Sequence, residues 1–178
     1  MASDDERRDR LTGLLAPLHD RARATARRLC RSNAEGDDLF HEAVLRAFDR
    51  LGELRDESSF RAWFYAVMLS VHRARHRRGL WRRFLSLDEA DVEPLTEGEA
   101  DGREGAERMT RALATLSAEA REAIVLFTLE GMSLEEVASL QGASLSAIKS
   151  RLSRARGRLR LHYERTDAAM RSRAARVV

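Results

Sequence analysis

Apolar residues return every three or four positions along most of the chain, which is the spacing of helices that bury one face. The first half carries three such stripes, and Pro17 predicts a kink or a new start within the first of them. Stripe by stripe, their members are Leu11, Leu14, Leu15, Leu18, Ala22 and Leu29; Leu39, Ala43, Ala47 and Leu51; and Phe60, Trp63, Phe64, Val67, Met68 and Val71. Asp37 and Asp38 suit the start of the second helix. Ser58 or Ser59 suits the N-cap of the third. We therefore expect three helices that share one core.

The second half carries four shorter stripes, which are separated by capping and turn residues. They consist of Met109, Ala112, Leu113 and Leu116; Ala123, Ile124 and Phe127; Leu134, Val137, Ala138 and Leu140; and Leu145, Ile148, Leu152, Ala155 and Leu159. Ser117 suits the N-cap of the second of these helices, and Gly131 suits its end. Ser133 and Glu136 form the S-x-x-E capping box of the third helix. Ser144 suits the N-cap of the fourth.

Three residues of the last two stripes have the sizes that a helix-turn-helix requires. Ala138 is small, Gly142 follows at a tight turn, and Ile148 is an aliphatic residue in the next helix. The outward face of that next helix presents hydroxyl and basic side chains, namely Ser146, Lys149, Ser150, Arg151, Ser153, Arg154 and Arg156. Side chains near the start of such a helix can contact base edges in the major groove, while later arginines bind phosphates. A solvated surface helix is the alternative interpretation of this face.

Composition favours an all-helical chain with two small domains. Only 10 of 178 residues are glycine and 2 are proline, and aromatic residues make up 6%, which disfavours sandwiches and barrels. Residues 86–107 hold nine acidic residues against one basic residue and lack apolar periodicity, as is typical of a linker. We expect an all-α fold divided into a helical domain at 1–85, an acidic linker at 86–107, a helix-turn-helix domain at 108–161 and a basic tail at 162–178, with disorder after Tyr163 as one option.

The net charge of +3 conceals blocks of opposite sign. Residues 72–83 carry six arginines and no carboxylate, and Trp81 and Phe84 lie in or beside this run. Because aromatic faces stack on unpaired bases while guanidinium groups hold the backbone, the run favours nucleic-acid binding over a solvated helix end. Residues 148–178 hold ten basic residues against two acidic ones, which enlarges the region attractive to a polyanion.

The sequence has no pattern typical of an active site or a cofactor site. Cys30 is the single cysteine, and His72 and His76, four residues apart, have no third metal ligand near them. Neither a glycine-rich phosphate loop nor a Walker motif occurs. The polar N-terminus and the short apolar run at 63–69 fit neither a signal peptide nor a membrane span. We therefore expect a cytoplasmic protein with no enzymatic activity, no metal and no cofactor.

Three segments carry a family resemblance. They are AEGDDLFHEAVLRAFDRL at 34–51, FRAWFYAVMLSVHRARHRR at 60–78 and SLEEVASLQGASLSAIKSRLSRARGRLR at 133–160. In this order, and on either side of an acidic linker, they resemble the two characteristic domains of bacterial sigma-70 family sigma factors of the compact extracytoplasmic-function (ECF) group. The resemblance covers about residues 10–80 and 108–161. The helix-turn-helix match is the most specific of the three.

The resemblance implies a sigma factor that binds core RNA polymerase at the clamp helices of the largest subunit and at the flap. It further implies recognition of promoter DNA, both double-stranded and melted, with a possible anti-sigma partner and no catalytic residues or membrane insertion. The residues that would dock on the polymerase are Asp38, Leu39, His41, Glu42, Arg46 and Phe48, of which Leu39 and Phe48 equally suit the core. The residues that would face the minus-10 element are Ser70, Arg73, Arg75, Arg77, Arg78 and Trp81. The residues that would read the minus-35 duplex are Ser144, Ser146, Lys149, Ser150, Arg151 and Arg154.

The chain departs from the family pattern at a few of these positions. The departing residues are His41, Leu69, Ser70, Ala74, Ser146 and Ala147, where the family usually has Gln, Arg, Asn, Asp, Gly and Thr. Three of these departures fall in the helix implied in minus-10 recognition, and those at Ser146 and Ala147 suggest a shifted minus-35 preference. A plain helix-turn-helix regulator that does not replace sigma is the main alternative, but it leaves the first half unexplained. A helical adaptor that binds only protein leaves Arg151 and Arg154 unexplained.

Overall fold

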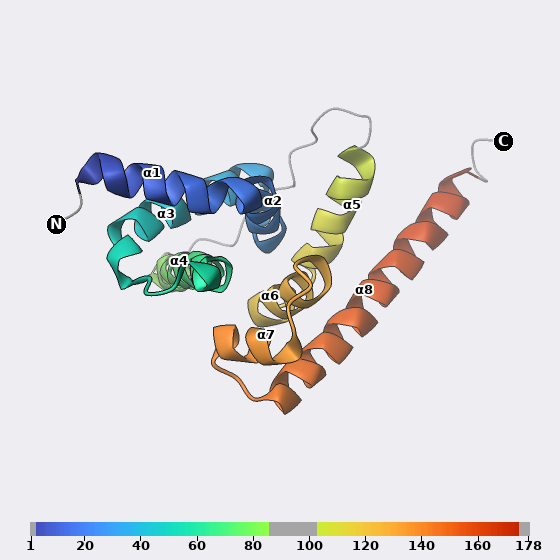
Figure 1. The fold of residues 1–178 in the computed structure, drawn as a ribbon. Coiled ribbons are helices and arrows are strands. Elements are labelled where there is room, and N and C mark those ends of the chain that lie inside the picture. The colour runs from blue at the N-terminus through green and yellow to red at the C-terminus, as the bar shows by residue number, and fades with distance from the viewer. Residues whose placement is uncertain (1–2, 86–102, 175–178) are drawn as a thin grey trace. The chain divides into compact units, whose positions relative to one another are not determined.

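The computed structural model describes residues 3–85 and 103–174, and the regular elements in those two ranges are all helical (Figure 1). The all-α prediction is therefore confirmed. The chain divides into two compact units, Met1–Thr96 and Glu97–Val178. Most of the predicted linker lies outside the described residues, but its last residues are helical because helix α5 begins at Arg103. The predicted domain boundaries stay predictions. No helix in the described ranges is both long and apolar enough to cross a bilayer.

The first helical segment of the N-terminal unit bends at Pro17, as predicted. Helix α1 (Asp4–Leu15) starts with a capping box in which Ser3 Oγ accepts the Glu6 N–H at 3.2 Å and the Ser3 N–H donates to the Glu6 carboxylate at 2.9 Å. Pro17 lies in the 3-10 turn η1 (Ala16–Leu18), and α2 (His19–Leu29) follows. Because proline has no N–H to donate and clashes with the preceding turn, the α-helix stops there and restarts.

Helix α3 (Asn33–Asp49) begins before the aspartates that were expected to start it. Its N-cap is Ser32, whose hydroxyl accepts the Glu35 N–H at 3.2 Å. Asp37 and Asp38 lie inside the helix, so the prediction that they mark its start is wrong. Their carboxylates are therefore available for contacts with other elements rather than for capping.

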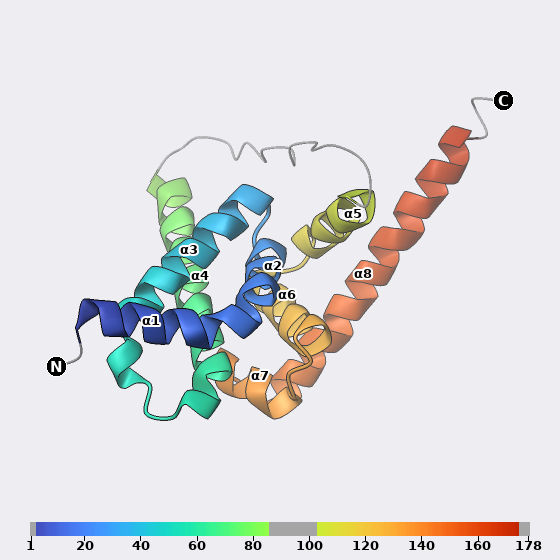
Figure 2. The ribbon, with the colours of Figure 1, turned by 45° about the horizontal axis from the view of Figure 1, so that its top comes forward.

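Gly36 and Asp37 join α3 to α2. A Cβ atom on Gly36 would lie 2.3 Å from the Cα atom of Arg27, so the helices touch backbone to backbone there. Figure 2 shows α2 and α3 as neighbours. The Asp37 carboxylate accepts two hydrogen bonds from Arg27, at 2.8 and 2.7 Å, and two from Arg23, at 2.8 and 3.1 Å. These bonds, first those of Arg27 and then those of Arg23, hold the pKa of Asp37 well below its usual range. Close packing at Gly36 and the ion pairs of Asp37 thus fix α3 against α2.

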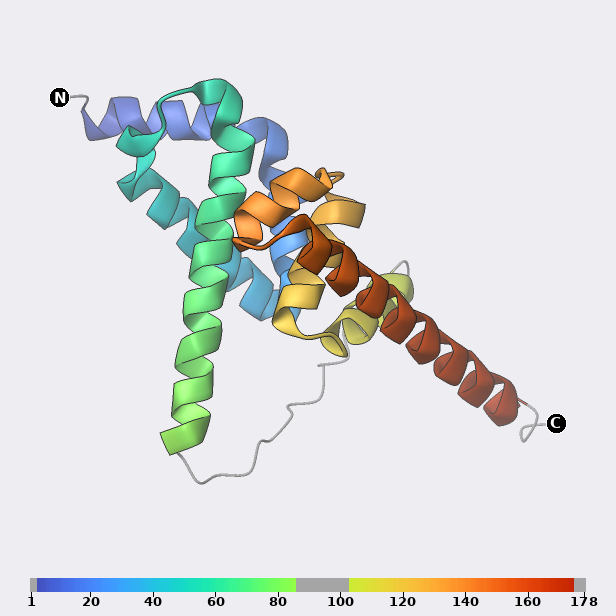
Figure 3. The ribbon, with the colours of Figure 1, turned by 90° about the horizontal axis from the view of Figure 1, so that it is seen from below.

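Helix α4 (Phe60–Leu85) follows two 3-10 turns, η2 (Leu51–Glu53) and η3 (Glu57–Ser59). Asp56 caps the turn η3, which leads directly into α4, and its carboxylate accepts the Ser58 N–H at 2.9 Å. The prediction of a serine N-cap is therefore wrong. In Figure 3 the last turns of α4 extend past the other helices of the unit.

Helix α4 buries more of its surface than its apolar stripe predicted. Phe64 and Met68 are buried as expected, but Tyr65 and Leu69, which lie outside the stripe, are also 0% exposed. Trp63, which belongs to the stripe, is only half-buried. Helix α3 packs on one side of α4 and α2 contacts it as well, so two neighbours widen the buried face.

The described C-terminal unit consists of α5 (Arg103–Ala114), α6 (Ala118–Ile124), the π-helical turn η4 (Val125–Leu129), α7 (Leu134–Gln141) and α8 (Leu145–Ala174). The predicted cap of α6 is confirmed, because Ser117 accepts the Ala120 N–H at 3.3 Å. Gly131 and Gly142 have positive φ angles of 66° and 58°, which favour glycine after a helix end. Both glycine stops are therefore confirmed.

Helix α8 is longer than the sequence predicted. It runs as one helix from Leu145 to Ala174, well past residue 161 (Figure 1). Its second half is held to α5, because Arg108 forms an ion pair with Asp167 and lies over the Tyr163 ring, with 5.0 Å between the guanidinium carbon and the ring centroid. The option of disorder after Tyr163 is therefore wrong as far as Ala174.

Candidate functional site

The helix-turn-helix is built by the caps that the sequence predicted. The hydroxyl of Ser133 accepts the Glu136 N–H at 3.1 Å, and the Glu136 carboxylate accepts the Ser133 N–H at 2.7 Å. After the turn at Gly142, the hydroxyl of Ser144 accepts the Ala147 N–H at 3.2 Å and starts α8. Ile148 is 0% exposed and anchors α8 to the core. Local caps and one buried residue thus orient the second helix of the motif.

The outward face of α8 presents most of the residues predicted to read the minus-35 duplex. The exposed ones are Ser144, Ser146, Lys149, Ser150 and Arg154. Arg151 is half-buried, and its Nη1 donates to the Gln141 side-chain oxygen at 2.7 Å. None of the ion pairs within the described residues involves Lys149, Arg151 or Arg154. The face therefore keeps its positive charge uncompensated, which suits an anionic partner.

Sequence reasoning missed a set of buried polar residues beneath this face. Arg121 is 7% exposed and donates to the carbonyls of Leu113 at 2.9 Å and Ala114 at 3.2 Å, so it binds the C-terminal end of α5. Glu122 is 1% exposed and accepts from the Gln141 amide at 3.2 Å. The sequence carried no clear signal of this, because charged and small apolar residues are interspersed along α6 and charged residues are rarely buried unless they have partners.

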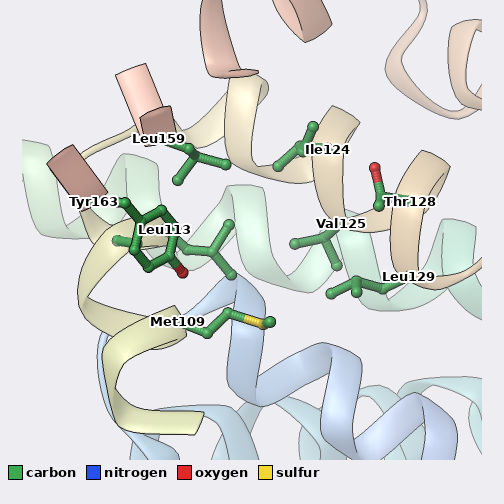
Figure 4. A pocket seen from close by; sticks show the side chains of 9 residues that line it. Met109, Leu113, Ile124, Val125, Thr128, Leu129, Leu159 and Tyr163 are labelled. Carbon is green, nitrogen blue, oxygen red and sulfur yellow. The ribbon is translucent and has the colours of Figure 1, made fainter. Parts of the chain in front are cut away.

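A groove in the C-terminal unit lies apart from this face. It has a volume of about 210 Å³, and its lining side chains point toward one another from α5, the α6–η4 segment and α8 (Figure 4). Its labelled members are Met109, Leu113, Ile124, Val125, Thr128, Leu129, Leu159 and Tyr163. Apart from the Thr128 hydroxyl and the Tyr163 phenol, these side chains offer no oxygen or nitrogen. The groove therefore has the character of a hydrophobic contact surface rather than of a reaction centre.

The predicted polymerase-docking residues divide between surface and core. Asp38, His41 and Arg46 are exposed on α3. Leu39 is 0% exposed, so of its two expected places it takes the one in the core. Phe48 is half-buried beneath the Arg7 guanidinium, whose carbon lies 4.6 Å from the ring centroid.

The predicted minus-10 residues lie along α4 with different degrees of exposure. Arg77 and Arg78 are exposed, and Arg73 is half-buried. Ser70 is exposed and its hydroxyl donates to the Val67 carbonyl at 2.7 Å. The structure describes side chains of α4 only as far as residue 78, so Trp81 lies outside that part. Leu69, which departs from the family pattern, lies in the core, and this explains why an apolar side chain is tolerated at that position.

The structure joins residues that the sequence assigned to separate interfaces. Arg75 Nη2 lies 2.6 Å from the Glu42 carboxylate, and Arg75 also donates to the Asp38 carbonyl at 3.0 Å. Both side chains of this ion pair are about one-third exposed, at 33% and 30%. The surface predicted to meet polymerase is thus in direct contact with the helix predicted to meet DNA.

Family comparisons assign both units. Residues 14–83 match the model described as Sigma-70 region 2, and residues 106–159 match the model described as Sigma-70, region 4. The first range includes α4 as far as residue 83, and the second includes α7 and the part of α8 up to residue 159. The order of the matches is the order that the sequence predicted.

Curated relatives and a solved structure agree with these matches. The chain is 31% identical over 142 residues to the ECF RNA polymerase sigma factor SigM of Mycobacterium tuberculosis, covering 80% of this chain and 69% of SigM. It is 32% identical over 144 residues to the probable RNA polymerase sigma factor RfaY of Xanthomonas campestris, covering 77% of this chain but spanning only 36% of the length of RfaY. The sigma factor RpoE of Bartonella quintana, solved with the anti-sigma factor NepR, aligns with a TM-score of 0.67 and 27% identity, covering 84% of this chain and 94% of RpoE.

Proposed function

Because this chain belongs to the ECF group of the sigma-70 family of RNA polymerase sigma factors, we propose that it directs core polymerase to a specific set of promoters. The observation that carries the proposal is the capped helix-turn-helix whose α8 presents cationic and hydroxyl side chains without neutralising carboxylates. The polymerase supplies the chemistry of RNA synthesis, and this chain supplies recognition. Such a factor acts in the cytoplasm, where core polymerase and promoters are found.

In this proposal α8 reads the minus-35 duplex from the major groove. The residues nearest its N-terminus, Ser144 and Ser146, are positioned for base edges, and Lys149 and Arg154 for the flanking phosphates. A hydroxyl can donate to or accept from a base edge, so these serines tolerate more than one base. Sequence preference then depends on how firmly the arginine side chains are oriented.

The N-terminal unit binds polymerase through α3 and melted DNA through α4. The exposed carboxylate of Asp38 and the partly exposed carboxylate of Glu42 suit basic residues of a clamp surface. The arginines of α4 hold a single-stranded backbone, and extraction of a base costs a few kcal/mol that stacking offsets. An anti-sigma partner is a further part of the proposal, supported by the complex solved for the similar RpoE.

Reconstituted transcription tests the function directly. Core polymerase is combined with the full chain on a library of random promoter fragments, and transcript starts are mapped. Starts that depend on the chain and share sequence motifs near positions minus 35 and minus 10 are expected. Core polymerase that initiates at the same positions and rates without the chain would contradict the proposal.

A charge reversal on α3 tests the polymerase interface. Glu42→Arg is expected to abolish co-purification with core polymerase, because it places a cation against a basic surface. Asp49→Arg makes the same change in charge at an exposed position on the same helix and is the control for charge, and Arg75→Ala is the control for loss of the ion pair with Glu42. Equal binding of Glu42→Arg and Asp49→Arg would rule out Glu42 as an interface residue.

A further inference from the structure

Arg151 differs from the other cationic residues at the start of α8. Lys149 and Arg154 are exposed, and Arg154 donates only within its own helix, to the Ser150 carbonyl at 3.4 Å. Arg151 is half-buried and is held from the other helix of the motif, by Gln141 at the end of α7. A guanidinium group has five N–H donors. Within the described residues Arg151 uses one of them, on Nη1, which leaves the rest of the fork for a ligand.

The orientation of the Gln141 amide follows from its other contacts. Its Nε2 donates to the Glu119 carbonyl at 2.9 Å and to the Glu122 carboxyl at 3.2 Å. Both partners are acceptors, so the reversed amide would place oxygen against oxygen on one side and N–H against N–H on the other. The side-chain oxygen therefore faces Arg151 as the only arrangement that satisfies every group.

The anchor of this chain of contacts is rigid. Glu122 is 1% exposed and lies on α6, which packs directly on α8. Gln141 is one of the partners of this buried carboxyl group, and a hydrogen bond to a buried acceptor offsets part of its desolvation cost, so the contact restricts the Gln141 amide. Glu119 and Glu122 on α6 thus hold Gln141 on α7, which in turn holds the guanidinium of Arg151 on α8.

The partner that holds Arg151 is neutral, and this decides what the contact does. Arg75 in the N-terminal unit is held by the Glu42 carboxylate, which cancels its charge. An amide oxygen fixes the direction of a guanidinium group without neutralising it. An arginine held in this way loses less side-chain entropy on binding and keeps its full attraction for a phosphate or a guanine.

We propose that Gln141, anchored by Glu122, is a positioning residue that preorganises Arg151 for the minus-35 duplex. This inference rests on the proposed function and adds a determinant outside the recognition helix itself. It makes the affinity that Arg151 contributes conditional on Gln141, although Gln141 need not touch DNA. Energetic coupling between the two positions is the measurable consequence.

A double-mutant cycle tests the coupling. Full-length wild type, Gln141→Met, Arg151→Ala and the double variant are each assembled with core polymerase. Their dissociation constants are measured on the promoter fragment mapped with the wild-type holoenzyme and on the same fragment with a scrambled minus-35 element. Gln141→Met preserves the volume of the side chain and removes its hydrogen bonds. Each single variant is expected to bind the intact fragment about tenfold more weakly, and the double variant no more weakly than Arg151→Ala. On the scrambled fragment Gln141→Met should bind as wild type does.

Controls separate positioning from folding. Ser139→Ala, at an exposed position on α7, is expected to leave affinity unchanged. Circular dichroism checks that the Gln141→Met protein keeps its helices, and Gln141→Asn, whose shorter amide cannot span the gap, repeats the cycle if it does not. Additive losses in the cycle, or tighter binding by Gln141→Met, would overturn the positioning role while leaving the proposed function intact. Failure of the wild-type holoenzyme to distinguish the two fragments would overturn both.

Discussion

The two units of the chain hold their helices together with different polar partners. In the N-terminal unit, arginines reach across helices to carboxylates, as Arg23 and Arg27 do to Asp37 and Arg75 does to Glu42. In the C-terminal unit, Arg108 also pairs with a carboxylate, that of Asp167, but Arg121 binds backbone carbonyls and Arg151 binds an amide. Carboxylates cancel the charge of the arginines they hold, and neutral acceptors do not. The difference teaches that Arg151, on the proposed DNA-reading face, is held in place without losing its positive charge.

The largest expected effect is at the helix contact of the N-terminal unit. Gly36→Ala places a methyl group 2.3 Å from the Arg27 backbone, and such overpacking costs about 3 kcal/mol of unfolding free energy. Both tryptophans, Trp63 and Trp81, belong to this unit, so their fluorescence during urea unfolding reports on it alone. Gly13→Ala, at a helical glycine with no atom within 4 Å, is the control and should stabilise slightly. A Gly36→Ala transition at the wild-type urea concentration would disprove the close contact.

The substitution expected to destabilise the C-terminal unit most is at the turn of the helix-turn-helix. Gly142 has a φ of 58°, and a β-branched residue there costs about 2 kcal/mol. Gly142→Val should therefore lower the thermal midpoint seen by circular dichroism while leaving the tryptophan transition unchanged. Gly157→Ala within α8, where nothing lies within 4 Å, is the control. A shift in the tryptophan transition would show that the two units do not unfold independently.

Acid should lower the stability of the N-terminal unit, because it protonates Asp37 and so removes its ion pairs with Arg23 and Arg27. The folded pKa of Asp37 lies below its unfolded value of about 4, so its stabilisation is present above that value and is lost as pH falls below it. Asp37→Asn is expected to cost about 1 kcal/mol at pH 7, since the arginine partners are partly exposed, and to flatten the loss of stability below about pH 4. Tryptophan-monitored unfolding from pH 7 to pH 3 measures both effects. Asp49→Asn, which removes no ion pair in the described residues, should leave the curve unchanged.

The smallest expected effect concerns the exposed charge of α8. Arg154→Ala should weaken promoter binding by about 1 kcal/mol and reduce the slope of log affinity against log salt by about one unit, because one phosphate contact is lost. Fluorescence anisotropy at several salt concentrations measures the slope. Arg8→Ala removes an arginine that pairs with Asp5 in the N-terminal unit, and it should not alter the slope. An unchanged slope in Arg154→Ala would show that Arg154 does not contact a phosphate and that another residue of the helix does.

The helix boundaries of the C-terminal unit were easier to predict from sequence than those of the N-terminal unit, because local capping and turn residues mark them. Its serine caps, capping box and glycine stops each act over three or four residues, so their effect is visible in sequence and was confirmed. In the N-terminal unit, the start of α3 was misplaced, whereas α4 begins at Phe60 as expected but follows a turn capped by Asp56 rather than by a serine. Asp37 looked like a residue of a helix start, but its partners lie on α2, ten and fourteen residues back along the chain. A sequence pattern cannot distinguish a capping carboxylate from one that binds another helix.

The sequence by itself determined the all-helical class, the two-part organisation and the residues of the cationic face, because helical periodicity and capping are local properties. Tertiary structure alone decided that Leu39 and Leu69 are core residues, that Glu42 holds Arg75, and that Gln141 and Glu122 hold Arg151. Those outcomes depend on which helices become neighbours and at what distance. That information arises only when separate apolar faces pack together and fix the positions of the polar groups around them.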